Sequence, residues 1–175
     1  DNERKKKIFF NKKILIYGLG KTGISSYFFL KKNNKVFLFD DIKKTSVNKK
    51  NIITSYFDYI LISPGINIKK CTLKNYIKNN SNKIITDLDV FYSHYSKNLN
   101  ISITGTNGKS TTAKILFHIL KDQKKDVRLV GNIGNAILKE KKISKKTIFV
   151  IEISSYQIEY SKYFQANYAA ILNIS

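Results

Sequence analysis

The sequence predicts an α/β fold in which a Rossmann-like parallel-sheet domain is followed by the first part of a P-loop-type domain. Short apolar runs rich in Ile, Val, Phe and Tyr alternate with longer segments of helical period, as in parallel sheets with crossover helices. Two of these runs lead directly into glycine-rich turns, and a helical segment follows each turn. The 175 residues, 42% of them apolar, suffice for one ordinary domain or two small ones.

The predicted elements follow in order along the chain. Strands are expected at 13–17, 36–39, 59–62, 83–85, 101–104, 127–130, 147–153 and 168–172. Helices are expected near 22–32, 70–79, 87–95, 109–121 and 155–163. The stretch 93–100 is polar and precedes the strand that leads into the second glycine-rich turn. We therefore expect a first domain at 1–97 and a second at 98–175.

The charge of the chain has two explanations. A formal net charge of +20 suits a partner such as nucleic acid or an anionic membrane surface. However, the lysines are scattered along the whole chain, and arginine, the preferred reader of phosphates and bases, occurs only at Arg4 and Arg128. A compositional bias toward residues with codons poor in G and C explains the lysines more simply. We expect no nucleic-acid partner.

The remaining composition indicates a cytoplasmic protein. A single cysteine, Cys71, excludes an internal disulfide and suits a reducing compartment. No stretch approaches the roughly 20 apolar residues of a membrane helix, and the basic start of the chain is a poor signal peptide. We therefore expect no membrane association. The chain opens on Asp1 and contains no methionine, so we expect it to be an excerpt of a longer translation product.

The first glycine-rich turn, YGLGKTG, follows an apolar strand and opens a helix. Gly18, Gly20 and Gly23 allow a tight turn and close approach of a ligand phosphate, to which the helix N-terminus offers free N–H groups. Asp40 follows the next strand, where a ribose hydroxyl is expected. Any nucleotide diphosphate suits this geometry. The alternative is that the small residues only let helix and strand pack closely.

The second glycine-rich turn is a phosphate cradle. It comprises Gly105, Thr106, Asn107, Gly108, Lys109, Ser110 and Thr111, between an apolar strand and a helix. Backbone N–H groups of such a loop wrap an anion, Lys109 adds a point charge, and a hydroxyl of Ser110 or Thr111 can bind Mg²⁺. The loop is shorter than GxxxxGK[ST], because Ile103 stands where the first glycine would be. We expect it to bind a nucleoside triphosphate.

A carboxylate completes this second site. Glu152 closes the apolar strand TIFVIE, where a Mg²⁺ ligand is needed beside a phosphate loop. The alternatives for Glu152 are an exposed strand-end residue or a favourable charge at the start of the next helix. Ser154, Ser155 and Gln157 add neutral groups that can reach a phosphate or sugar.

Together these motifs resemble the Mur ligase family. GLGKTG, the SPG of 63–65, GTNGKST at 105–111, GNIG at 131–134 and EISSYQIE at 152–159 appear in the family's order across roughly residues 13–175. The resemblance implies an ATP-dependent, ADP-forming amide ligase of peptidoglycan precursor synthesis. Its GNIG and EISSYQ motifs favour addition of D-glutamate to UDP-N-acetylmuramoyl-L-alanine through an acyl phosphate. A sister ligase that adds another amino acid is the main alternative.

The resemblance also assigns roles to residues. Lys109 would be catalytic by stabilising charge on the transferred γ-phosphate, while Ser110 and Glu152 would hold Mg²⁺. The UDP substrate would contact Gly20, Lys21, Thr22, Asp40, Asp41, Ser63, Pro64, Gly65, Asn132, Ser154 and Gln157. Where the family has a hydroxyl-bearing and a basic residue after the second strand, this chain has Asp41 and Ile42. We expect ATP and Mg²⁺ as cofactors and a monomer with small-molecule substrates.

The resemblance further implies that the central domain is incomplete and that a carboxyl-terminal domain is absent, so we expect the chain alone to be inactive. Two other classes of function remain open. A nicotinamide-dependent dehydrogenase explains the first turn but leaves the second turn and Glu152 without a role. A basic nucleic-acid binder explains the charge but not the glycine-rich turns. Thr86 and Asp89 are spaced as a helix capping box, with Asp87 favourable at the N-terminus, so we interpret them as structural.

Overall fold

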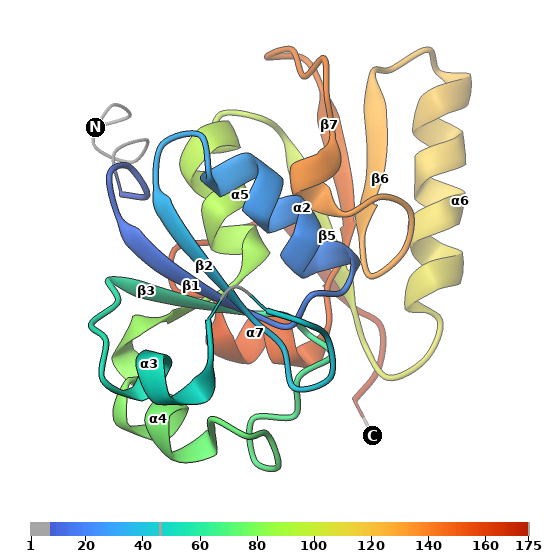
Figure 1. The fold of residues 1–175 in the computed structure, drawn as a ribbon. Helices are drawn as coiled ribbons and strands as arrows, with labels where there is room; N and C mark the ends of the chain where they lie inside the picture. Colours follow the sequence, from blue (N-terminus) through green and yellow to red (C-terminus); the bar gives the residue numbers. More distant parts are fainter. Residues whose placement is uncertain (1–7, 46, 175) are drawn as a thin grey trace.

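The computed structural model describes residues 8–45 and 47–174, and within these ranges the chain forms two parallel four-stranded sheets (Figure 1). The first sheet has the order β2-β1-β3-β4 and contains β1 (Lys13–Tyr17), β2 (Lys35–Phe39), β3 (Tyr59–Ile62) and β4 (Ile84–Ile85). The second has the order β6-β7-β5-β8 and contains β5 (Asn100–Thr104), β6 (Val127–Gly131), β7 (Ile148–Glu152) and β8 (Tyr168–Ile171). The predicted α/β fold class with parallel sheets is confirmed.

Helices form the layers between and outside the sheets. They are α2 (Lys21–Leu30), α3 (Lys49–Ile53), α4 (Lys74–Asn79), α5 (Asp87–Tyr95), α6 (Lys109–Asp122) and α7 (Ser155–Tyr160), with short 3-10 turns η1 (Ser81–Lys83) and η2 (Ile137–Lys139). Figure 1 shows α2 and α5 between the two sheets and α6 on the outer side of the second sheet. None of the described helices is long and apolar enough to cross a membrane.

The predicted helices are present, but some of their bounds were wrong. The helix expected at 70–79 begins only at Lys74, after a turn in which the N–H of Lys70 bonds to the carbonyl of Asn67. The helix expected at 155–163 ends at Tyr160, because the following N–H groups, from Lys162 onward, bond to the carboxylate of Asp89. Helix α3 was missed, since its five residues are too few to show a helical period.

The periodicity of the sequence explains which faces are buried. In α6, Ala113, Leu116, Phe117 and Leu120 recur at helical spacing and pack on the second sheet, whereas Ile115 and Ile119 on the other side are exposed. In α2, buried residues recur at Gly23, Ser26 and Leu30. The strands β1 and β3 are almost wholly buried, as expected of parallel strands covered by helices on both faces.

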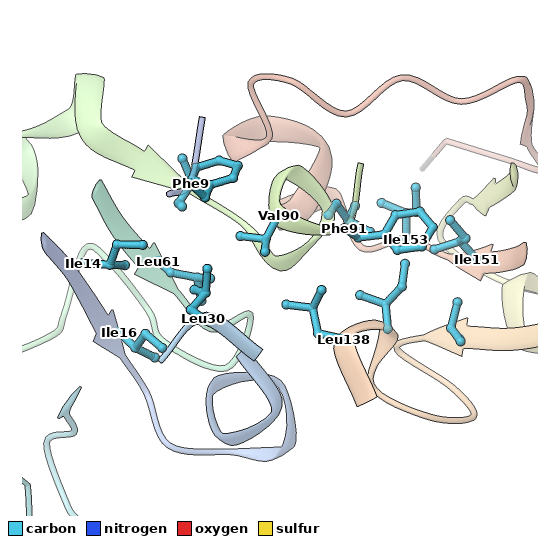
Figure 2. Close-up of a cluster of buried hydrophobic side chains, with 14 of the residues drawn as sticks. Phe9, Ile14, Ile16, Leu30, Leu61, Val90, Phe91, Leu138, Ile151 and Ile153 are labelled. Atoms are coloured by element: carbon cyan, nitrogen blue, oxygen red, sulfur yellow. The ribbon is translucent and has the colours of Figure 1, made fainter. Parts of the chain in front are cut away.

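One hydrophobic cluster joins the two sheets (Figure 2). It contains Ile14 and Ile16 of β1, Phe91 of α5, and Phe149 and Ile151 of β7. The rings of Phe91 and Phe149 meet edge to face with centroids 4.8 Å apart. Because this cluster is continuous, the two sheets share one hydrophobic core, and loops at their carboxyl ends line the same cavity. The division at residue 97 into two domains stays a prediction.

Candidate functional site

A cavity of about 610 Å³ lies where loops from the carboxyl ends of both sheets meet. Many of its walls are residues that the motifs singled out, namely Gly20, Lys21, Thr22, Asp40, Asp41, Ser63, Pro64, Gly65 and Asn132. Leu19, Ile42, Lys43, Ile66, Asn67, Lys70, Cys71, Gly131, Gly134 and Ala136 are further members of the lining. Residues from both halves of the chain therefore build one cavity, next to strand ends where α/β sheets bind ligands.

The first glycine-rich turn forms the tight bend that its sequence predicts. Gly18 has φ +95°, and its N–H bonds to the carbonyl of Phe39 at 2.8 Å. A Cβ on Gly23 would lie 1.9 Å from the carbonyl oxygen of Gly18, so a side chain does not fit there. Gly20 caps α2 without a side-chain hydrogen bond. The N-terminus of this ten-residue helix therefore faces the cavity with its backbone N–H groups uncapped by any side chain.

Asp40 links this turn to the loop after β2. Its carboxylate accepts hydrogen bonds from the N–H of Leu19 at 2.6 Å, of Ile42 at 2.9 Å and of Lys43 at 3.0 Å. Partial burial alone would favour the neutral acid, but these three N–H groups and the nearby Lys43 ammonium lower the pKa of Asp40 below its usual value. Asp40 is therefore ionised, and its carboxylate oxygens already accept hydrogen bonds from backbone N–H groups.

Asp41, the next residue, is held differently. The hydroxyl of Tyr17, at the end of β1, donates to the Asp41 carboxylate with both oxygens at 2.7 Å. The N–H of Thr72 donates to the same carboxylate at 3.4 Å. Burial and this hydrogen bond raise the pKa of Tyr17, so its hydroxyl stays protonated and remains a donor. The side chain of Asp41 itself is exposed in the cavity wall.

The predicted phosphate loop, residues 105–111, runs from β5 into α6. Gly105 has φ +141° and Gly108, the N-cap of α6, has φ +81°, so both glycines take conformations that other residues rarely adopt. The Lys109 ammonium bends back over the loop and bonds to the carbonyls of Gly105 and Thr106. Asn107 and Asn173 bond to each other, which ties the loop to the segment after β8. Thr111 is exposed in the first turn of α6.

The carboxylate of Glu152 lies next to this loop. It accepts a hydrogen bond from the Ser110 hydroxyl at 2.7 Å, and Glu152 is buried at the end of β7. The interpretation of Glu152 as an exposed strand-end residue is therefore wrong. Among residues 8–45 and 47–174 no cluster of three His, Cys, Asp or Glu residues is placed to hold a metal. The Ser110–Glu152 pair nevertheless fits Mg²⁺, which commonly takes one or two carboxylates together with phosphate oxygens.

The backbone of Glu152 also bonds to a turn that lines the cavity. Its carbonyl accepts a hydrogen bond from the N–H of Asn132 at 3.1 Å. Gly131 has φ +104°, and a Cβ there would lie 2.2 Å from the same carbonyl oxygen. This glycine is therefore what allows the Asn132 turn to approach β7 so closely. A single residue, Glu152, contacts the phosphate loop through its side chain and the cavity turn through its backbone.

Ser154 and Gln157 lie apart from the other predicted ligands and do not line the cavity. They form the capping box of α7, and the Gln157 side chain is buried. Its Nε2 donates to Asp87 of α5 at 2.9 Å. Burial raises the pKa of Asp87, against the hydrogen bonds that favour its charged form. Thr86 and Asp89 form the capping box predicted for α5.

Sequence reasoning missed several residues around the cavity and between the sheets. Tyr17 had the pattern of an ordinary strand residue, and Lys43, whose ammonium bonds to the carbonyl of Leu19 at 2.7 Å, had that of solvated loop charge. The Oδ1 atom of Asp89 accepts hydrogen bonds from the N–H groups of Lys162, Tyr163 and Phe164, which lie 73 to 75 residues further along the chain. No local signal announces such contacts, because they depend on how distant segments meet.

Comparison with known proteins gives consistent results. Residues 103–175 match the family described as "Mur ligase middle domain". The chain is 38% identical over 176 residues to UDP-N-acetylmuramoylalanine--D-glutamate ligase of Rickettsia felis, covering 93% of this chain and 38% of that protein. It is 39% identical over 181 residues to the enzyme of that name from Buchnera aphidicola subsp. Schizaphis graminum, covering 95% and 40%. The chain thus spans about two fifths of the length of these relatives.

A solved structure supports the fold. UDP-N-acetylmuramate:L-alanyl-gamma-D-glutamyl-meso-diaminopimelate ligase from Neisseria meningitides matches with a TM-score of 0.55 at 15% identity, over 94% of this chain and 61% of that one. At this identity the likeness concerns the fold alone. Its parallel α/β architecture agrees with the two sheets described above.

Proposed function

We propose, from the premise that this chain belongs to the Mur ligase family, that it serves an ATP-dependent amide ligase which adds D-glutamate to UDP-N-acetylmuramoyl-L-alanine. The reaction would proceed through an acyl phosphate and supply peptidoglycan precursors. The single observation that carries this proposal is the position of Glu152, whose side chain bonds to the phosphate loop and whose carbonyl bonds to Asn132 in the wall of a nucleotide-sized cavity. A ligase that joins a nucleotide-linked substrate to chemistry driven by ATP needs two such sites side by side.

The phosphate loop is assigned to ATP. Residues 105–111 would bind its phosphates through backbone N–H groups, and the Lys109 ammonium would exchange its carbonyl partners for γ-phosphate oxygens. Ser110 and Glu152 supply the two oxygens that would hold Mg²⁺. When bound, ATP would supply the phosphoryl group that activates the substrate carboxylate, and Mg²⁺ would neutralise negative charge on the phosphates. The hydrogen bond between Ser110 and Glu152 would hold these two side chains in position for the metal.

The cavity is assigned to the UDP-linked precursor. Its volume of about 610 Å³ lies within the range of small-molecule sites. Gly20, Lys21 and Thr22 at the start of α2 would bind the diphosphate, and Pro64, Gly65 and Asn132 would line its path toward the second sheet. Ser63 donates to the carbonyl of Gly18 at 2.7 Å, so it would shape the turn that the diphosphate meets. Ser154 and Gln157 would support the site indirectly, by holding α7 against α5.

We also propose that the protein works in the cytoplasm as a monomer, with the precursor, D-glutamate and ATP as small-molecule partners and without nucleic acid or membrane. The two domains, 1–97 and 98–175, would bind the precursor and ATP respectively. A nicotinamide-dependent dehydrogenase leaves the Ser110–Glu152 pair and the Lys109 loop without a role. A sister ligase would use the same two sites and differ in the precursor it prefers.

Calorimetric titration tests this assignment. The folded chain is titrated with UDP-N-acetylmuramoyl-L-alanine, with UDP-N-acetylmuramic acid that lacks the alanine, and with NADH. We expect binding of the alanine-bearing precursor and none of NADH. Stronger binding of the precursor without alanine would favour a sister ligase. NADH binding alone, or no binding by a folded sample, would overturn the proposal.

A further inference from the structure

The carbonyl of Ile62, the last residue of β3, points past the end of the neighbouring strand. The N–H of Ser63 bonds to the carbonyl of Tyr17 in β1 at 2.9 Å. Because a peptide unit is planar and trans, the Ile62 carbonyl points the opposite way, toward the β4 side of the sheet. However, β4 ends at Ile85, which pairs with Leu61. Ile62 is buried, so its carbonyl needs a donor from outside the sheet.

Tyr156 of α7 is that donor, although it lies in the other half of the chain. Its hydroxyl donates to the Ile62 carbonyl at 3.2 Å. The ring of Tyr156 packs against the hydrophobic cluster that includes Tyr17 and Ile62. Burial raises the pKa of Tyr156 above its usual value, so the hydroxyl keeps its proton and remains a donor. A side chain that follows the second sheet's strand β7 therefore satisfies a backbone acceptor of the first sheet.

The helix that carries Tyr156 is itself held against the first half of the chain. Gln157 donates to Asp87 at 2.9 Å, and the hydroxyls of Thr86 and Ser161 share a hydrogen bond of 2.7 Å. Because Gln157 is the next residue after Tyr156, the tyrosine reaches the end of β3 from a fixed support. Of these contacts, the bond at the end of β3 is the one that adjoins the cavity, since the residue that follows lines it.

The turn that follows Ile62 is held from two sides. Residues 63–65 line the cavity and are among those assigned to the precursor. The Ser63 hydroxyl donates to the carbonyl of Gly18 at 2.7 Å, which ties the turn to the glycine-rich turn after β1. The hydroxyl of Tyr156 holds it from the β4 side. Loss of that hydroxyl leaves a buried carbonyl without its donor, which costs free energy unless the turn moves.

We propose that Tyr156 is a positioning residue for the UDP-linked precursor. Its hydroxyl, acting through the carbonyl of Ile62, holds the turn at 63–65 in the place where the turn contacts the bound precursor. This inference rests on the proposed function, because it concerns the same cavity. It adds that the half of the chain assigned to ATP also contributes to precursor binding, through a residue that does not line the cavity.

Tyr156→Phe tests the proposal, because it removes the hydroxyl and keeps the ring. Tyr76→Phe is the matched control. The Tyr76 hydroxyl donates to the carbonyl of Ser55 at 3.1 Å, shortly before β3 begins, and neither residue lines the cavity. Burial raises the pKa of Tyr76 as it does that of Tyr156. Each variant therefore loses one hydrogen bond from a tyrosine to a backbone carbonyl, at opposite ends of the same strand.

Calorimetric titration, urea denaturation and amide hydrogen exchange are measured on the wild type and both variants, after circular dichroism confirms that they are folded. We expect the affinity for UDP-N-acetylmuramoyl-L-alanine to fall about two- to tenfold in Tyr156→Phe, the effect of one neutral hydrogen bond, and to stay unchanged in Tyr76→Phe. The urea midpoints should fall alike in both variants. The affinity for ATP with Mg²⁺ should be the same in all three proteins. The N–H groups of Ser63 and Gly65 should exchange faster only in Tyr156→Phe.

The outcomes separate this inference from the proposed function. An unchanged precursor affinity in Tyr156→Phe would overturn the inference, while precursor binding by the wild type still supported the ligase. An equal loss of affinity in Tyr156→Phe and Tyr76→Phe, or for the precursor and ATP alike, would also overturn it, since a merely structural role loosens the whole chain. A wild type that binds no precursor would overturn the proposed function and this inference with it.

Discussion

The Nε2 of Gln157 donates to Oδ1 of Asp87 at 2.9 Å, and both side chains are buried between the two halves of the chain. Asp87 opens α5 and Gln157 belongs to the capping box of α7. The bond therefore joins α5, which follows the first sheet, to α7, which follows β7. Gln157, which belongs to the cap of α7, thus also holds α5 in position.

The pH dependence of stability should show the raised pKa of Asp87. Burial keeps a proton on this carboxyl to a higher pH than in the unfolded chain, where its pKa is about 3.9. Its contribution to stability is therefore fully present below that value and is lost as pH rises through the folded pKa. Asp87→Asn stays neutral and keeps an acceptor for Gln157. We expect the Tm of Asp87→Asn, measured relative to wild type, to increase between pH 4 and pH 8.

A Tm difference that stays constant across this range would contradict the assignment. Asp40 and Asp126, the residue before β6 that accepts a hydrogen bond from the Thr147 hydroxyl, cancel in this difference, although hydrogen bonds lower both of their pKa values. Their contributions are present above the unfolded value and are lost as pH falls through the folded pKa, in wild type and variant alike.

Replacing Lys109 should weaken ATP binding without affecting the cavity. Lys109→Ala removes the ammonium that lies over the phosphate loop, and we expect the affinity for ATP with Mg²⁺ to fall at least about tenfold. Lys114→Ala, which removes an exposed charge from the same helix, is the control. Binding of the UDP-linked precursor should be the same in both variants. Equal effects of the two substitutions would show that only net charge matters.

Glu152→Gln should separate metal binding from folding. The amide oxygen can still accept the Ser110 hydroxyl, but a neutral group is a poor Mg²⁺ ligand. We expect Mg²⁺ to strengthen ATP binding to the wild type and to have little effect on Glu152→Gln. Titrations with ATP at several Mg²⁺ concentrations measure this. Glu159→Gln, an exposed position on α7, should behave as the wild type; a retained Mg²⁺ response in Glu152→Gln would argue against the site.

Gly131→Ala should destabilise the protein by about 1–3 kcal/mol or more, because φ is +104° and the added Cβ would lie 2.2 Å from the carbonyl oxygen of Glu152. Gly65→Ala is the matched control, since no atom lies within 4 Å of a Cβ there. Urea denaturation followed by circular dichroism gives both free energies of unfolding. Similar values for the two variants would show that the turn adapts.

The cluster between the sheets should behave as one core. Phe91→Ala removes a fully buried ring that meets Phe149 across the two halves of the chain, and we expect a loss of about 3–5 kcal/mol in the free energy of unfolding. Tyr92→Ala, at the next and only half-buried position, should cost less. Denaturation that remained a single transition in both would indicate one cooperative unit, as the continuous cluster predicts.

The sequence predicted the elements better than the contacts among them. The strands and both glycine-rich turns follow from local signals, namely apolar runs and glycines at strand ends, and each was found close to its expected range. The capping box of Thr86 and Asp89 was also predicted, because both residues belong to one turn of helix. Helix α3 was not, since Asn48 alone marks its start by accepting the N–H of Asn51.

Contacts between distant segments remained out of reach. The bond from Tyr17 to Asp41 spans 24 residues and the bond from Gln157 to Asp87 spans 70. Neither pair has a spacing that a helix or strand would impose, and both depend on how strand ends and helices meet in three dimensions. The sequence could therefore indicate which residues belong to the candidate site. That Asp40 accepts backbone N–H groups while Asp41 accepts the Tyr17 hydroxyl could be seen only in the structure.

Glu152 has a consequence for the distance between the two proposed ligands. Its side chain bonds to Ser110 and its own carbonyl to Asn132, so the two contacts are separated by the covalent bonds of one amino acid. The distance between the phosphate loop and the cavity turn at these contacts is therefore limited by the reach of one glutamate side chain. Glu152→Asp, which is one methylene shorter, would therefore either bring the two ligands closer together or break the hydrogen bond to Ser110.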